Sequence, residues 1–167
     1  MHLFQKGLMV AGVGLVVAAG TVGVFAADDK AAAIKERGDF MGAQQKAVGQ
    51  VQAFGKGTGD RQGAIDGVTK LIAMSDELQA KFVAFFPPGT SNVEFPNDAR
   101  AKPELWQGTN LEQAKAGIPK MHDAEVKLLE VVKTADAETV GKAMNDTYRD
   151  TCNGLCHNSY RGPEIKH

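Results

Sequence analysis

Apolar side chains recur at intervals of three and four residues in three long stretches of the chain, which is the spacing that places them on one face of an α-helix. The stretches span residues 31–54, 62–85 and 109–134, and Thr109 or Asn110 can cap the third. A fourth helix is predicted to start at Asp136 and to run into the segment around residue 152. Four amphipathic helices without a strand pattern predict an all-α fold, an antiparallel four-helix bundle.

The breaks between these stretches differ in length. Three glycines within residues 55–60 end the first stretch, because glycine is the usual residue just past a helix end. Residues 86–108 hold four of the six prolines, so no continuous helix can pass through them. We therefore expect short connections before the second and fourth helices and one long connection before the third.

The N-terminus carries a different pattern. Lys6 precedes an unbroken apolar run, which ends in the small-residue pattern Val24-Phe25-Ala26. This pattern predicts a cleaved signal peptide over residues 1–26, export to the periplasm, and one mature domain over 27–167. The alternative is an uncleaved anchor helix, since the run approaches the roughly 20 residues that span a bilayer. After cleavage we expect no membrane span.

The charge balance narrows the classes of partner. The whole chain has 19 basic and 20 acidic side chains, and cleavage removes only Lys6 from these, which leaves 18 against 20 and a net charge of −2. A chain without a basic patch has little with which to neutralise phosphates. Nucleic-acid binding is therefore not expected.

Both cysteines fall in one short segment, Cys152-Asn153-Gly154-Leu155-Cys156, which His157 follows directly. The usual covalent haem signature is Cys-x-x-Cys-His, in which two thiols bond the porphyrin and the adjacent imidazole ligates the iron. Here three residues separate the cysteines instead of two. Positions four apart still share a helix face, and Gly154 is permissive enough in its backbone to absorb the extra residue.

Several further segments together resemble the cytochrome c′ family over nearly all of the mature chain. The C-terminal run CHNSYR at 156–161 resembles the family's terminal motif, and FPPGT at 86–90 and AKPELW at 101–106 resemble its connection between the second and third helices. In the first helix, Arg37 followed by Met41 resembles the family's arginine and distal residue.

This resemblance implies one haem c, with its iron, bonded through Cys152 and Cys156, with His157 as the axial ligand. It also implies that Arg161 lies over the same edge of the haem and that Arg37 lies near the propionates, whose charge a cation offsets. Met41 would face the iron from the opposite side, either as packing or as a sixth ligand, as in the related low-spin cytochromes c-556.

The function that follows from the resemblance is one-electron transfer, reversible binding of nitric oxide or carbon monoxide, or both, without conventional catalysis. Oxygen is expected to be disfavoured, because the first helix offers Phe40 and Met41 here and no obvious hydrogen-bond donor. The expected partners are a redox protein and a second copy of the chain, because family members often pair through their first two helices.

Two haem-free alternatives stay open from the residues alone. One is an exported helical interaction protein in which Cys152 and Cys156 form a local disulfide, whose Cα separation on a helix is permitted. The other is a zinc site that uses both cysteines and His157, although three clustered ligands are too few for a closed structural site.

Overall fold

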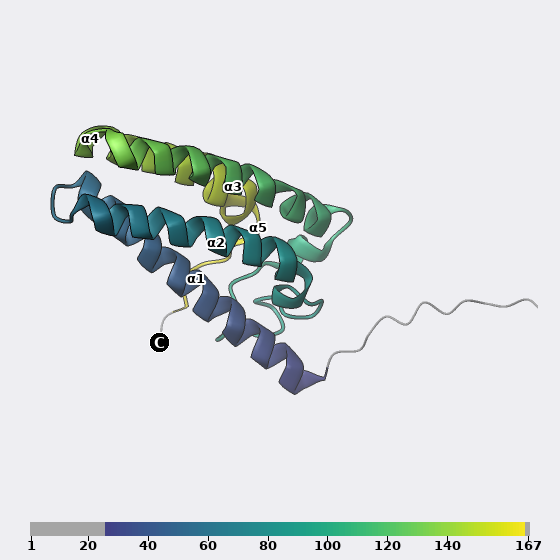
Figure 1. The fold of residues 1–167 in the computed structure, drawn as a ribbon. Helices are drawn as coiled ribbons and strands as arrows, with labels where there is room; N and C mark the ends of the chain where they lie inside the picture. Colours follow the sequence, from purple (N-terminus) through teal and green to yellow (C-terminus); the bar gives the residue numbers. More distant parts are fainter. Residues whose placement is uncertain (1–25, 166–167) are drawn as a thin grey trace, which may run out of the picture.

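Four long helices account for most of the computed structural model, which describes residues 26–165 (Figure 1). In chain order the helical elements are α1 Ala27–Gly55, α2 Arg61–Phe85, the 3₁₀-helix η1 Pro103–Trp106, α3 Asn110–Thr134, α4 Ala137–Tyr148, the π-helix η2 Arg149–His157 and the single turn α5 Asn158–Tyr160. The predicted all-α bundle is confirmed. The predicted signal segment lies almost wholly outside the described residues.

The two short connections are defined by local chemistry. Gly57 follows α1 with a φ of 72°, a left-handed conformation that favours glycine. Asp60 then caps α2 by accepting a hydrogen bond of 2.7 Å from the backbone N–H of Gly63. Asp136 caps α4 in the same way, through the backbone N–H of Thr139 at 2.8 Å. Both caps satisfy backbone donors that a helix start leaves unpaired.

The helices pack as antiparallel neighbours, with α1 against α2, α2 against α3, and α4 against both α1 and α3. Figure 1 shows α3 and α4 as one layer above α1 and α2. Where α1 ends, a Cβ on Gly55 would lie only 2.7 Å from the Cα of Gly141 on α4. Two glycines at this crossing therefore allow the two backbones to come close together.

The buried core divides into two clusters along the bundle. The first, here called the aliphatic cluster, lies at the end where α1 meets α2, and it consists of Ala47, Val48, Val51, Ala64, Val68, Leu71, Leu128, Val132, Val140 and Met144. The second, here called the aromatic cluster, lies toward the long connection, and it consists of Phe40, Met74, Leu78, Phe82, Phe85, Ala101, Leu105, Ala114, Ile118 and Met121. Cys152 and Cys156 pack against the aromatic cluster and not against the aliphatic one.

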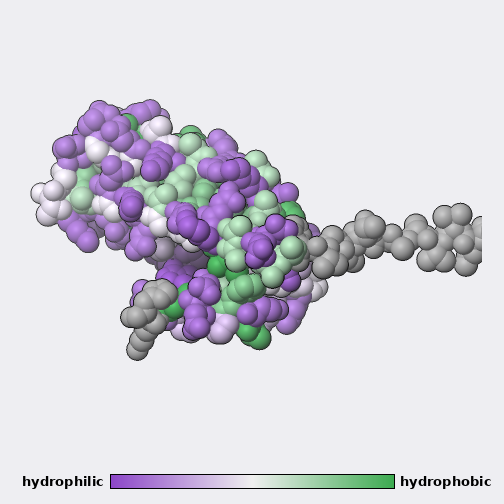
Figure 2. Space-filling model, turned by 90° about the horizontal axis from the view of Figure 1, so that it is seen from below, coloured by the Kyte–Doolittle hydropathy of each residue, from purple (hydrophilic) through white to green (hydrophobic). Residues whose placement is uncertain are grey.

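The long connection closes the end of the aromatic cluster. Trp106 packs on this cluster, and its indole N–H donates to the carbonyl of Phe86 at 3.0 Å. The face seen in Figure 2 is mostly hydrophilic, with hydrophobic residues in smaller patches. Within residues 26–165, none of the helices combines the length and the apolar character needed to cross a membrane.

Candidate functional site

A cavity beside the aromatic cluster brings together residues from four helices. Its lining is made of Met41 and Gln44 from α1, Leu78 from α2, Ala114, Gly117, Ile118 and Met121 from α3, and Thr151, Cys152, Leu155, Cys156 and His157 from η2. Four of the six residues singled out from the sequence, namely Met41, Cys152, Cys156 and His157, therefore meet around one space. Arg161 adjoins it through His157, whereas Arg37 does not line it.

The cysteine segment is a π-helix, not the continuation of α4 that the sequence suggested. A turn closed by bonds from i to i+5 holds about one residue more than an α-helical turn. The wider turn therefore accommodates the extra residue between Cys152 and Cys156. The widening is spread over all nine residues of η2. Gly154 does not absorb it alone, since the glycines with positive φ are Gly57, Gly89 and Gly108 among the described residues. π-Turns of this kind often mark functional sites.

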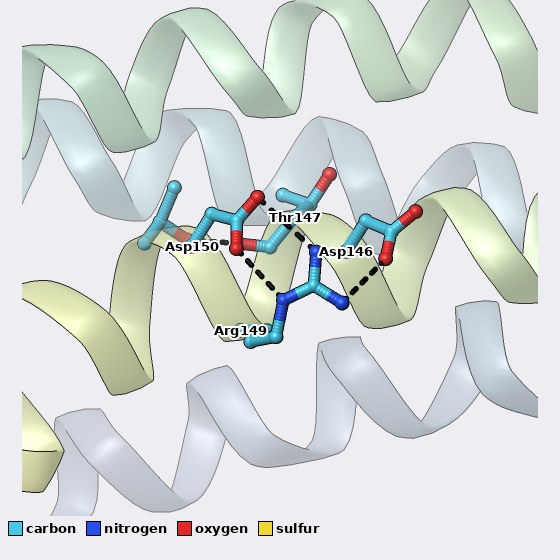
Figure 3. Close-up of polar contacts among 5 residues, drawn as sticks. Asp146, Thr147, Arg149 and Asp150 are labelled. Atoms are coloured by element: carbon cyan, nitrogen blue, oxygen red, sulfur yellow. Dashed lines mark hydrogen bonds and ion pairs between the residues drawn. The ribbon is translucent and has the colours of Figure 1, made fainter.

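Polar contacts hold the start of the π-helix. Arg149 reaches Asp146 with Nη1 at 2.9 Å and Asp150 with Nε at 2.9 Å, and Figure 3 shows its guanidinium between the two carboxylates. The hydroxyl of Thr151 donates to the carbonyl of Thr147 at 2.6 Å. These contacts all lie within residues 146–151, where α4 ends and η2 begins.

Both cysteines are free thiols in the structure. Burial raises the pKa of Cys152 and of Cys156 to about 11, so both thiols keep their protons at neutral pH. Sγ of Cys152 lies 3.6 Å from Sδ of Met121. Within residues 26–165, no three His, Cys, Asp or Glu side chains are grouped so as to hold a metal ion.

His157 is oriented by an arginine and a tyrosine. Its Nδ1 lies 3.2 Å from Nη1 of Arg161, and because a guanidinium only donates, Nδ1 accepts there and Nε2 of the neutral ring carries the proton. To ligate a metal through Nε2, the ring has to move this proton to Nδ1 and give up the contact with Arg161. The ring of Tyr148 meets the imidazole edge-on, with centroids 6.4 Å apart. Burial, reinforced by the positive charges of Arg161 and Arg100, lowers the pKa of His157 to about 4. The imidazole is therefore neutral at physiological pH, which is the form that binds metals.

The segment after His157 is fastened to the long connection. The backbone N–H of Lys102 donates to Tyr160 at 2.9 Å, that of Gly162 donates to Arg100 at 2.6 Å, and Ala101 pairs with Arg161 in an isolated antiparallel bridge. These contacts join the sequence motif around residue 101 to the terminal motif. They hold the position of His157 from its C-terminal side.

Arg37 is a buried residue of the same end of the bundle. It donates to the carbonyls of Phe85 at 3.2 Å and Thr90 at 3.1 Å, and to the Thr90 hydroxyl at 3.2 Å. Its guanidinium also lies 5.1 Å from the ring centroid of Phe86, and burial lowers its pKa to about 10. In the described structure Arg37 thus ties α1 to the end of α2, and its contact with propionates stays a prediction.

Gln44 is the residue of this site that the sequence reasoning missed. It lines the cavity three positions after Met41, is 7% exposed, and holds an Nε2 that has no hydrogen-bond partner among the described residues. The expectation that this part of the first helix lacks a donor is therefore wrong. The signal was present in the spacing, because residues 37, 41 and 44 share one helical face.

Comparisons with known proteins agree with this architecture. Residues 32–161 match the sequence model of the family described as Cytochrome C'. Among solved structures, the cytochrome c' from Rhodobacter Spheriodes is 19% identical, with a TM-score of 0.65 over 81% of this chain and 98% of that one. A cytochrome c' with an unusual ligand-controlled dimer dissociation is 25% identical, with a TM-score of 0.65 over 80% of this chain and 97% of that one. No curated protein sequence matches this chain.

Proposed function

The chain belongs to the cytochrome c′ family, and from this membership we propose that it is an exported cytochrome with one haem bonded to Cys152 and Cys156 and ligated by His157. Haem binding itself follows from the family. The number of thioether bonds, the axial ligand, periplasmic location and gas binding are the parts that we propose.

The observation that carries the proposal is the composition of the cavity. Two thiols and a neutral imidazole meet there with apolar side chains from α2 and α3, namely Leu78, Ala114 and Ile118. A porphyrin needs an apolar slot, two thiols that can add to its vinyl groups and one neutral nitrogen for its iron. The residues present therefore fit the group, and the unpaired Nε2 of Gln44 provides a polar contact besides.

A haem bound there supplies an iron that cycles between ferrous and ferric states and takes small ligands. The protein's own contribution is to hold it. Each cysteine, Cys152 and Cys156, would add its thiol across the double bond of one vinyl group. The thiol proton would go to one vinyl carbon, and the sulfur would bond to the second carbon of the same group. Tyr148 would orient His157 through its edge-on contact, and the apolar lining would exclude water.

Whether Met41 binds the iron determines which of the two proposed activities, electron transfer or gas binding, the protein has. Because it lines the cavity, its thioether is available as a sixth ligand, which would favour electron transfer. Without that bond, the iron would be open to nitric oxide or carbon monoxide. We propose no conventional catalysis in either case, and we propose a homodimer, since one relative is described by its dimer dissociation.

The experiment is the visible spectrum of the full chain, oxidised and reduced, after expression in a host that attaches c-type haem. Sharp, split reduced bands would identify a six-coordinate iron, for which Met41 is the sixth ligand that we propose, and a broad spectrum that sharpens with carbon monoxide would identify an open site. The mass of the denatured protein should include haem, and the single variants Cys152→Ala and Cys156→Ala each remove one bond. A colourless protein would contradict the proposal, and a periplasmic fraction without the protein would contradict export.

A further inference from the structure

Glu125 is a buried carboxyl that the proposed haem attachment does not use. It lies on α3 and is 3% exposed, and one of its oxygens accepts a hydrogen bond of 2.5 Å from the hydroxyl of Ser75 on α2. Burial raises the pKa of this carboxyl to about 7. A modest change in its surroundings therefore decides whether Glu125 holds a proton near neutral pH.

Glu125 lies one helical turn from the lining of the cavity proposed for the haem. Met121, four positions earlier on α3, lines that cavity, and its Sδ is 3.6 Å from Sγ of Cys152. Residues four positions apart share a helix face, so Glu125 and Met121 point to the same side of α3. Burial is the main cause of the raised pKa of the Cys152 thiol, and the charge of Glu125 adds to it. The carboxyl therefore acts electrostatically on the place where we propose that the haem is attached.

The hydroxyl that contacts Glu125 also borders a second cavity. Ser75 lines this space between α2 and α3, and the lining includes Asp76, Gln79 and His122. The side chains of Asp76 and His122 are 72% and 33% exposed, so the space reaches solvent. Because a hydroxyl both donates and accepts hydrogen bonds, Ser75 connects the buried carboxyl to this polar space.

The groups that act on the charge of Glu125 oppose one another. After burial and the Ser75 hydrogen bond, His122 on the same helix lowers its pKa and Asp76 on α2 raises it. On η2 the group that its charge reaches is the thiol of Cys152, and the buried side chains of α4, Val140 and Met144, are uncharged. A positive charge that arises in the haem cavity therefore acts on a carboxyl whose charged neighbours nearly cancel.

We propose that Glu125 is a proton site coupled to the haem, which binds a proton when the iron is reduced and releases it when the iron is oxidised. The inference rests on the haem function proposed above. Oxidation transfers one electron from the ferrous haem to a one-electron acceptor and leaves one more positive charge in the cavity. This charge favours the carboxylate form of Glu125, so the carboxyl O–H bond breaks and the proton leaves past Ser75 to solvent. Reduction by a one-electron donor reverses both steps.

The test measures the midpoint reduction potential of the holoprotein between about pH 5 and 9, the range around the titration of Glu125. We expect oxidation to weaken proton binding at Glu125 about tenfold, so the potential should fall by about 59 mV in total as the pH rises. The direction follows because the carboxylate present at high pH stabilises the ferric form. Glu125→Gln keeps the size and the hydrogen-bond acceptor but cannot ionise. This variant should remove the fall and hold the potential at the acid value of the wild type.

A second measurement identifies the carboxyl directly. In the infrared difference spectrum between the oxidised and reduced wild type near neutral pH, the C=O band of a protonated carboxyl should disappear on oxidation. This change should be absent in Glu125→Gln. Ser75→Ala keeps the carboxyl and removes a hydrogen bond to its charged form, so it should move the fall in potential to higher pH without abolishing it. It tests the same coupling if Glu125→Gln does not fold.

Glu130→Gln is the matched control. Glu130 lies on the same helix, but its side chain is 68% exposed and pairs with Lys133. This variant should keep the pH dependence of the wild-type potential, because solvent screens an exposed charge.

Two results would overturn the inference while haem attachment stands. One is a coloured Glu125→Gln variant whose potential falls with pH as in the wild type, which would assign the proton to another group such as His122. The other is a wild-type potential that stays constant over this pH range. A colourless protein would overturn the proposed function, and this inference with it.

Discussion

The two ends of the bundle are built from the same four helices but have different interiors. In the aliphatic cluster five of the ten buried residues, Val51, Ala64, Val68, Val132 and Val140, are 0% exposed. In the aromatic cluster the least exposed member is Phe85 at 1%, and the cavity with the cysteines lies beside it. The first end is complete as a protein core, whereas the second borders the cavity at which we propose that haem binds. On this proposal, stability and function are located at opposite ends.

A buried polar pair marks the boundary between these ends. On α2, Ser75 follows Met74 of the aromatic cluster, and on α3, Glu125 lies between Met121 of the aromatic cluster and Leu128 of the aliphatic one. The hydroxyl of Ser75 donates to Glu125 at 2.5 Å, and Glu125 is only 3% exposed. Four sets of substitutions test the difference between the two ends of the bundle.

The largest effect is expected from Cys152→Ala combined with Cys156→Ala. Covalent haem should be lost completely, because no other cysteine is present in the chain. Amide hydrogen exchange of this variant should show fast exchange in η2 and around the aromatic cluster, with protection kept around the aliphatic cluster. Uniformly fast exchange in both regions would show that the aliphatic end does not fold without haem.

The next effect comes from deleting the same side chain at each end. In the haem-free double variant, Leu128→Ala should lower the free energy of unfolding by about 3–5 kcal/mol, because it opens a cavity in a fully packed region. Leu78→Ala should cost about 2 kcal/mol, at the low end of the range, because Leu78 already borders a cavity. Urea unfolding followed by circular dichroism measures both, and equal costs would contradict the comparison.

The pair of Ser75 and Glu125 predicts that the free energy of unfolding depends on pH, an effect of intermediate size among the four. Burial raises the pKa of Glu125 to about 7, against the opposing hydrogen bond from Ser75. The carboxyl of Glu125 therefore keeps its proton in the folded protein at a pH where the unfolded chain has lost it. This proton's contribution to the free energy of unfolding is complete below about pH 4.5 and is lost as the pH rises through 7. Relative to Glu125→Gln, wild type should lose roughly 3 kcal/mol of stability between pH 4.5 and 8.

The charged groups near Glu125 are His122 on its own helix and Asp76 on α2, whose effects on its pKa oppose each other. Ser75→Ala is the control, since it removes the hydrogen bond that lowers the pKa and should move the loss of stability to higher pH. Parallel stability curves for wild type and Glu125→Gln would show that Glu125 does not titrate in this range.

Much of this fold could be predicted from the sequence, because periodicity and helix breakers act locally. The stripe on residues 62–85 and the glycines after α1 specify their elements without tertiary information, and the observed helix α2 Arg61–Phe85 differs by one residue. The π-helix could not be predicted in this way. Its widened turn packs against α3, with Leu155 against Gly117, and only the folded chain brings these two residues together.

The part of the site that lies in one short sequence motif could be predicted. The buried polar residues of the helices could not. Cys152, Cys156 and His157 are adjacent in sequence, so their shared location follows at once. Gln44 and Glu125 look like surface residues of amphipathic helices, because glutamine and glutamate are rarely buried. Only the packing of neighbouring helices shows that both are enclosed.

The smallest effect concerns how the helices start at each end. At the aliphatic end, Asp60 accepts a backbone hydrogen bond at the start of α2. At the aromatic end, α3 begins after Thr109, whose side chain makes no capping bond and instead accepts from the amide of Gln113 at 2.9 Å. Asp60→Ala should therefore lower the free energy of unfolding by about 1 kcal/mol, the usual cost of a lost cap, while Thr109→Ala should change it by less than about 0.5 kcal/mol.

Asp60→Asn separates the cap from the charge, because asparagine caps a helix about as well as aspartate does. We expect this variant to keep nearly all of the wild-type stability, measured by urea unfolding at constant pH. A full loss in Asp60→Asn would assign the effect to the negative charge near the positive end of the helix dipole. Equal losses in Asp60→Ala and Thr109→Ala would instead mean that the two side chains support their helix starts to the same extent, and the contrast between the two ends would then be confined to their cores.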